Sequence, residues 1–173
     1  DRSKVLELFD KSLTLNPSAK GYYWRGIFKF DDYSIERSEA IDDFTRSIKI
    51  QPKRIVPYQA RARAYSSTSN YKKQLSDLTT VINLIEEANN KKELAYRVTN
   101  QYRKLSKKEI IEESKYFANE FLGQAYLDRA RYFKRNGNNS NFACKDYRSA
   151  DAVSHNQYFQ ESDYRFVDQN CSK

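Results

Sequence analysis

A helical pattern that returns after 35 residues constrains this 173-residue chain more than any other feature. The dipeptides Asn16-Pro17 and Gln51-Pro52 each close a stretch in which apolar or small residues recur at i, i+4 and i+7. That spacing places the residues on one face of an α-helix, and the proline marks the end of the helix. Further copies of the stretch cover residues 75–82 and 143–150. The chain is therefore predicted to repeat a helical unit, and such units stack into arrays.

A second helical stretch precedes each of the last three copies. It contains an aromatic residue, then Arg, then a small residue, which is Gly26, Ala62 or Ala130. The small residue is expected to let two helices approach closely where they cross. The space beside it is expected to be filled by aromatic side chains downstream, namely Phe30, Tyr65 and Phe133.

The composition agrees with long helices. The chain has only 4 Gly and 3 Pro, too few for a turn-rich β fold, while 39% of its residues are hydrophobic and can supply a core. No apolar run approaches the ~18 residues that a membrane-spanning helix needs. Because the chain contains no Met, it is expected to be a processed or excised product from which any targeting segment is already gone. The expected fold class is all-α.

These features resemble the tetratricopeptide repeat family, whose unit is an antiparallel helix pair with this small and aromatic pattern and a closing proline. The resemblance implies a right-handed superhelix of stacked helix pairs in a single array. It divides the chain into a half repeat (1–17), three repeats (18–53, 54–87 and 123–157), a degenerate helix pair (88–122) and a C-terminal capping helix (158–173). A long helical insertion is the alternative for 88–122, which matches the pattern poorly.

In this family the first helix of each pair lines a concave groove that receives a peptide or a partner helix. The resemblance therefore implies a non-enzymatic protein-interaction module. An apolar wall near the N-terminus gives way to a basic end, which would suit a partner with an apolar anchor and an acidic segment. For Ile27 and Phe30, completion of the core between repeats is a nearly equal alternative. The implied groove residues are Lys20, Tyr23, Ile27, Phe30, Gln59, Arg63, Ser66, Gln124, Leu127, Arg131 and Lys134.

The residues predict no catalytic centre, metal site or cofactor. His155 is the only histidine, so catalysis by a Ser-His-Asp or Cys-His set would have to use it. Adjacent acids such as Asp42-Asp43 point about 100° apart on a helix and do not converge on one ion. We interpret them as solvated faces.

The positive charge is uneven, and it supports a rival function. The net charge is +8, and residues 91–135 hold twelve bases against six acids. Such a patch could bind nucleic acid or another anionic surface, although a solvated face is the simpler interpretation. A purely structural role within a larger assembly, with the chain as a scaffold, is a further alternative. The oligomeric state is left open.

The two cysteines suggest a disulfide. Cys144 falls on the second helix of the last repeat and Cys171 near the end of the capping helix, so antiparallel packing could bring them together. The arrangement resembles exported bacterial repeat proteins with a cysteine in the last repeat and another near the C-terminus. That resemblance implies a periplasmic or cell-surface location. The alternative is one buried and one free thiol in a cytoplasmic protein.

Overall fold

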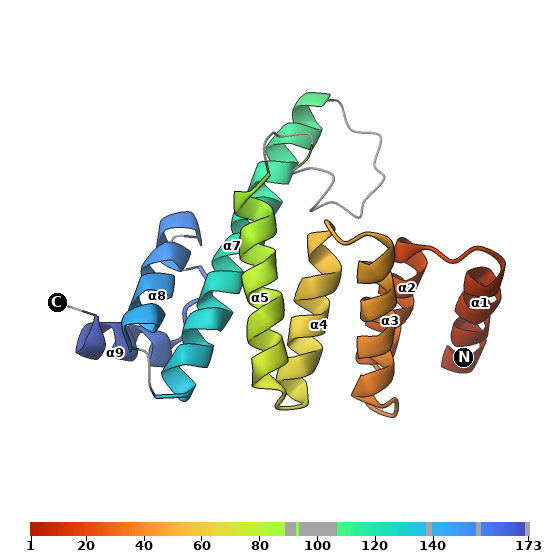
Figure 1. Ribbon diagram of the computed structural model, residues 1–173, viewed down its shortest axis with the longest axis horizontal. Coiled ribbons are helices and arrows are strands. Elements are labelled where there is room, and N and C mark those ends of the chain that lie inside the picture. The colour runs from red at the N-terminus through yellow and green to blue at the C-terminus, as the bar shows by residue number, and fades with distance from the viewer. Residues whose placement is uncertain (89–92, 94–106, 138–139, 155–156, 172–173) are drawn as a thin grey trace. The chain divides into compact units, whose positions relative to one another are not determined.

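The computed structural model describes residues 1–88, 93, 107–137, 140–154 and 157–171 (Figure 1). These residues contain no strand, so the all-α prediction is confirmed for them. The labelled helices are α1 (Arg2–Leu15), α2 (Ala19–Phe30), α3 (Arg37–Ile50), α4 (Ile55–Ser67), α5 (Tyr71–Glu86), α7 (Lys107–Arg135), α8 (Ser140–Ser154) and α9 (Glu161–Asn170).

The chain forms two compact units. The first comprises Asp1–Gln74 and the second Leu75–Lys173, and the boundary falls inside α5. Each unit is built around one antiparallel helix hairpin, α2–α3 in the first and α7–α8 in the second.

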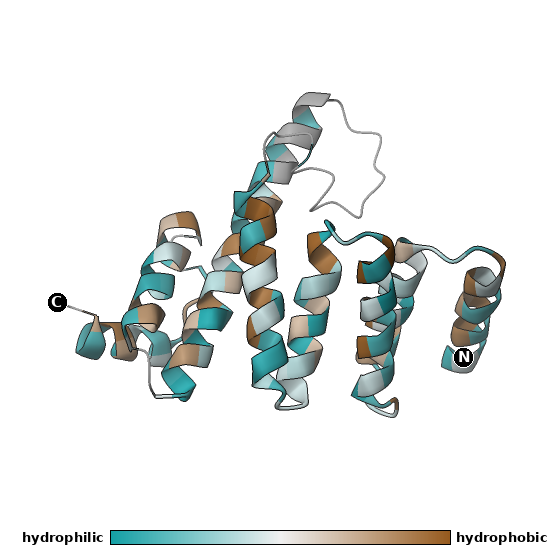
Figure 2. Ribbon diagram, viewed as in Figure 1, coloured by the Kyte–Doolittle hydropathy of each residue, from teal (hydrophilic) through white to brown (hydrophobic). Residues whose placement is uncertain are grey.

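The first unit packs α4 across the α2–α3 hairpin. Helix α2 begins directly after Pro17 because Ser18 caps it, with its Oγ accepting a hydrogen bond from the Gly21 N–H at 3.1 Å. Its apolar side chains then lie half-buried against a core of Ala40 and Phe44 from α3 and residues from α4. In Figure 2, hydrophobic bands recur along the helices of this unit, including α1.

Small residues lie at the helix crossings, as the sequence predicts. A Cβ atom built on Gly26 would lie 2.7 Å from Cε1 of Phe44, so only glycine lets α2 approach α3 this closely. At the matched positions, 1% of Ala62 and 0% of Ala130 is exposed. The close helix approach is therefore confirmed at Gly26, and Ala130 lies in the α7–α8 core, while Ala62 is buried.

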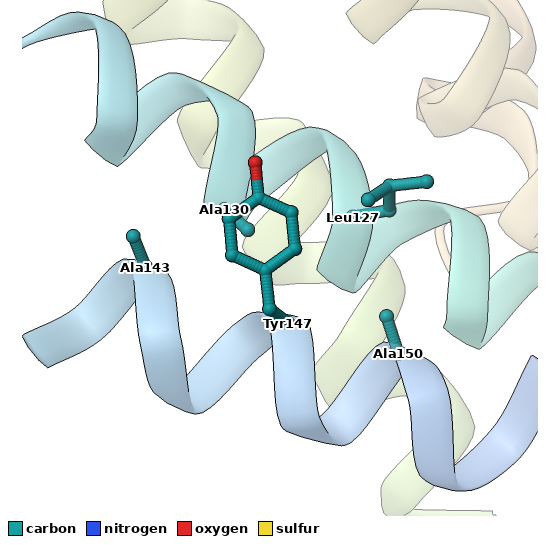
Figure 3. Packing of buried hydrophobic residues seen from close by; sticks show 5 residues of the cluster. All are labelled: Leu127, Ala130, Ala143, Tyr147 and Ala150. Carbon is teal, nitrogen blue, oxygen red and sulfur yellow. The ribbon is translucent and has the colours of Figure 1, made fainter. Parts of the chain in front are cut away.

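The second unit has its core between α7 and α8. Figure 3 shows Leu127 and Ala130 on α7 opposite Ala143, Tyr147 and Ala150 on α8. The Tyr147 ring extends from α8 to the α7 backbone beside Ala130.

Helix α7 differs from the expected division of the chain. A boundary was predicted between residues 122 and 123, where one helix pair would end and the next begin, but α7 runs unbroken through 29 residues. Gly123 does not end the helix. It is buried, and an added Cβ would lie 2.8 Å from Cβ of Ser154 on α8, so this glycine serves a close contact. The expected partner helix around residues 94–102 lies outside the described residues.

Candidate functional site

Both hairpins carry a buried ion pair between their helices. In the first unit, the Arg25 guanidinium donates to both carboxylate oxygens of Asp43, at 2.8 Å from Nε and 2.5 Å from Nη2. In the second, Arg129 binds Asp146 in the same way, at 2.6 and 2.8 Å. Only 1% of Asp43 and 2% of Asp146 is exposed. Bidentate pairs of this kind fix the geometry of the two helices.

The interpretation of Asp42-Asp43 as a solvated face is therefore wrong for Asp43. Asp42 is exposed, whereas Asp43 points inward and is satisfied by Arg25. The sequence does contain a signal for this role. An aspartate precedes the large apolar residue in three copies of the second helix, and the third, Asp77, is also buried at 4% exposure. An arginine precedes the small residue in each matching first helix.

The predicted groove residues of α2 are partly exposed. Tyr23, Ile27 and Phe30 lie half-buried against the core of α3 and α4, so part of each side chain completes the core between helices. Arg63 of α4 is exposed, and its guanidinium lies 5.8 Å from the Phe30 ring centroid. The other predicted residues of this unit are exposed (Lys20) or half-buried (Gln59 and Ser66).

The charges of Arg63, Arg54 and Asp31 all act on the Tyr23 hydroxyl. Burial raises the pKa of Tyr23, although the positive charges of Arg63 and Arg54 act in the opposite direction. The hydroxyl therefore stays protonated at neutral pH and can donate a hydrogen bond. The surface formed by Tyr23, Ile27, Phe30 and Arg63, which we call the α2–α4 face, combines apolar area with positive charge.

The predicted groove residues of the second unit are largely occupied by α9. Leu127 is 1% exposed and belongs to the core, so the prediction that it contacts a ligand is wrong. Arg131 donates to Asp163 at 2.7 Å and to the Tyr158 carbonyl at 3.1 Å. Lys134 donates to the Ser162 carbonyl at 2.5 Å. These two bases hold the chain's own C-terminal helix.

Gln124, the remaining predicted groove residue, is half-buried on α7. Its side-chain amide donates to Oδ1 of Asp128 one helical turn away, at 3.0 Å. This contact is local to α7.

A buried carboxylate anchors α9. Asp163 is 1% exposed and accepts hydrogen bonds from Arg131, from the Tyr147 hydroxyl at 2.7 Å and from the Gln160 N–H at 3.0 Å. Burial alone would raise the pKa of Asp163, but these donors outweigh burial and lower it. Burial raises the pKa of Tyr147, and its hydrogen bond to the Asp163 carboxylate raises that pKa further.

The two cysteines, Cys144 of α8 and Cys171 at the C-terminal end of α9, lie next to each other. The Cys144 and Cys171 sulfur atoms lie 2.04 Å apart, which is disulfide distance, and their Cα atoms lie 5.4 Å apart. Arg148 on α8 donates to the Cys171 carbonyl at 2.6 Å. The end of α9 is thus joined to α8 by the disulfide and a charged hydrogen bond.

Comparisons with known proteins give little beyond this geometry. No protein-family model matches the chain, and no curated protein matches it. Among solved structures, the crystal structure of MamA is 14% identical to this chain, covers 91% of each chain and superposes with a TM-score of 0.46. A likeness at that level carries no argument. The resemblance to tetratricopeptide repeats therefore depends on the helix hairpins and on the small residues within them.

The basic region 91–135 lies partly outside the described residues. Of its described bases, Arg129 is paired with Asp146, and Arg131 and Lys134 contact α9. These three side chains thus already have protein partners.

Neither a metal site nor a membrane span emerges from the described part of the chain. Within it, no three His, Cys, Asp or Glu side chains gather closely enough to hold a metal ion. None of its helices is long and apolar enough to cross a bilayer. His155 lies outside the described residues.

Proposed function

We propose that this protein is a non-enzymatic protein-interaction module that binds a partner segment on the α2–α4 face. The observation that carries the proposal is the Arg63 guanidinium stacked over Phe30 next to the half-exposed Tyr23 and Ile27. Apolar area ringed by a few fixed polar groups is typical of surfaces that recognise peptides. Lys20, Gln59 and Ser66 would border the same surface.

The charges on this face define the partner. The Arg63 guanidinium is exposed beside the Phe30 ring. A carboxylate placed beside it would receive charge-assisted hydrogen bonds, while an apolar side chain covers Ile27 and Phe30. The partner segment should therefore combine an apolar anchor with an acidic residue. The groove proposed here excludes Leu127, Arg131 and Lys134, because the core and α9 already use them.

A charge reversal tests this function. The immobilised full chain should capture a partner protein. The same chain with Arg63→Glu should capture at least tenfold less of that protein, as measured by quantitative mass spectrometry. Lys49→Glu is the matched control, because it makes the same charge change at an exposed residue of α3, outside the face. Equal capture by the wild type and Arg63→Glu would refute the proposed face.

We further propose that the protein works in an oxidising compartment, the periplasm or the cell surface, rather than the cytoplasm. The close approach of Cys144 and Cys171 supports this, because disulfides persist mainly outside the cytosol. Protein isolated from its native cells in the presence of an alkylating agent should carry no added alkyl groups. Two alkylated thiols would place it in a reducing compartment.

A further inference from the structure

An apolar cleft lies between α1 and α2. Its volume is about 440 Å³, and it is lined by Phe9 of α1, by Trp24, Ile27 and Phe28 of α2, and by Asp31 directly after α2. We call it the α1–α2 cleft. Trp24 is 42% exposed in spite of its size. Of these residues only Ile27 also belongs to the α2–α4 face.

The same unit contains a filled counterpart of this cleft. When the repeats are aligned at Gly26 and Ala62, Trp24 corresponds to Ala60 and Phe28 to Ala64. When the repeats are aligned at Pro17 and Pro52, Phe9 corresponds to Phe44 of α3. Ala60, Ala64 and Phe44 form the core between α3 and α4, and helix α2 packs against that core.

The helix that fills the counterpart shows which kind of segment would fit the α1–α2 cleft. Helix α2 places three apolar side chains on the core between α3 and α4, those of Tyr23, Ile27 and Phe30. They have the spacing i, i+4, i+7, which is a single helical stripe. Among the described residues, the cleft is lined by α1, α2 and the following Asp31, and Trp24 and Phe28 stand where the filled counterpart has Ala60 and Ala64.

We propose that the α1–α2 cleft binds an amphipathic α-helix of a partner protein. The helix presents apolar residues at i, i+4 and i+7 to Phe9, Trp24 and Phe28. It lies alongside α2 as α2 lies alongside α4, so its C-terminal turn ends near Asp31. A basic residue in that turn faces the Asp31 carboxylate, and the negative end of the helix dipole favours a base at the same place.

Charge and packing both favour a partner helix over a second copy of the chain as the occupant of the cleft. At the Asp31 end of the cleft, the neighbouring carboxylate of Asp32 is already bound by Arg2 at 2.7 Å, whereas Asp31 lines the open cleft. Within the described residues, three of the chain's own helices with this stripe, α2, α3 and α8, have it packed inside their own units. A second copy would have to unpack one of these helices to offer such a stripe.

The test uses the full chain and a synthetic helical peptide. The peptide has an Ala, Glu and Lys background without Trp or Tyr, with Leu at i, i+4 and i+7 and Lys at i+11. Trp24 is the sole tryptophan of the chain, so its emission reports on the cleft directly. Peptide binding should shift this emission saturably to shorter wavelength, and a peptide with Ser in place of the three Leu residues should not.

Variants locate the binding by the anisotropy of a labelled peptide. Trp24→Ala should weaken binding at least tenfold, whereas Ile50→Ser, an equally exposed apolar position on α3, should leave it unchanged. Asp31→Lys should weaken binding of the Lys peptide and strengthen that of a matching Glu peptide. The charge swap also gives a result if Trp24→Ala folds poorly.

Several results would overturn the proposal. One is the absence of any saturable emission shift at millimolar peptide, and another is binding that neither Trp24→Ala nor the Asp31 swap alters. A third is self-association without peptide, detected by sedimentation and accompanied by the same emission shift. That last result would assign the cleft to a second copy of the chain.

Discussion

The two halves of the buried pair Arg129–Asp146 should differ in what their removal costs. The Asp146 side chain is 3% exposed and that of Arg129 is 19% exposed. Arg129→Met leaves a buried carboxylate without its two donors. Asp146→Asn leaves a guanidinium that still reaches water and an amide oxygen that still accepts. We expect the arginine substitution to be the more damaging of the two.

The magnitudes follow from the state of the stranded carboxylate. Losing one partner of a buried pair costs about 3–5 kcal/mol. An ordinary aspartate titrates near 3.9, so protonating it at pH 7 costs about 4 kcal/mol, and this limits the penalty. Arg129→Met should therefore lower the free energy of unfolding by about 3–4 kcal/mol. Asp146→Asn should lower it by about 1.5–3 kcal/mol, the range for hydrogen bonds to charged groups.

Urea unfolding followed by circular dichroism measures both values, with no reductant present. At pH 5, protonating an ordinary aspartate costs only about 1.5 kcal/mol, so the loss of unfolding free energy caused by Arg129→Met should be smaller there. The double variant Arg129→Met with Asp146→Leu should recover most of the loss. Equal penalties, the reverse order, or a pH-independent Arg129→Met penalty would refute the reasoning.

The pair in the first unit is an internal control. Asp43 also lies 3.2 Å from the Lys29 ammonium, so it keeps a cation when Arg25 is removed. Arg25→Met should therefore cost less than Arg129→Met. If the two penalties are the same, the cost does not come from the unpaired carboxylate.

Three further predictions concern the packing and the C-terminal helix. Gly26→Ala should destabilise by about 1 kcal/mol, because overpacking against the buried Phe44 ring outweighs the gain in helix propensity; a rise in urea midpoint would contradict this. Reducing the bond between Cys144 and Cys171 opens a span of 27 residues and should cost about 3.5 kcal/mol in the chain-entropy model, so an unchanged midpoint in reductant would count against a closed disulfide. The folded-state pKa of Asp163 is lowered, so its contribution is complete above pH ~4 and is lost as the pH falls through the folded value. When the pH is lowered, the free energy of unfolding of Asp163→Asn should therefore not show the part of the loss that Asp163 causes in the wild type.

The sequence predicted the features that depend on one helix or on one crossing. Apolar stripes and closing prolines located the helices because they act over a few residues. Gly26 and Ala130 marked crossings because a close helix contact excludes larger side chains. Local signals of this kind can be recognised in a single sequence.

Features that need two helices at once were missed. Asp43 and Asp146 look like surface charges in isolation, and only the opposing arginine explains their burial. The unbroken α7 was missed because Gly123 can end a helix or serve a close contact, and its neighbour Ser154 is 31 residues away in sequence. The occupation of Arg131 and Lys134 by α9 likewise depends on tertiary packing.

The last helix shows how one position in the repeat acquires opposite roles. Ile27 and Arg131 correspond in the aligned repeats, and each packs beneath the helix that follows its hairpin. In the first unit the contact is apolar. In the second it is a buried carboxylate held by Arg131 and Tyr147, together with the cysteine pair at the end of α9. The polar contact and the cysteine pair thus add to the packing of Phe166 and Val167 in holding α9 on the second unit, whereas the partner helix proposed for the α1–α2 cleft would be held mainly by apolar packing.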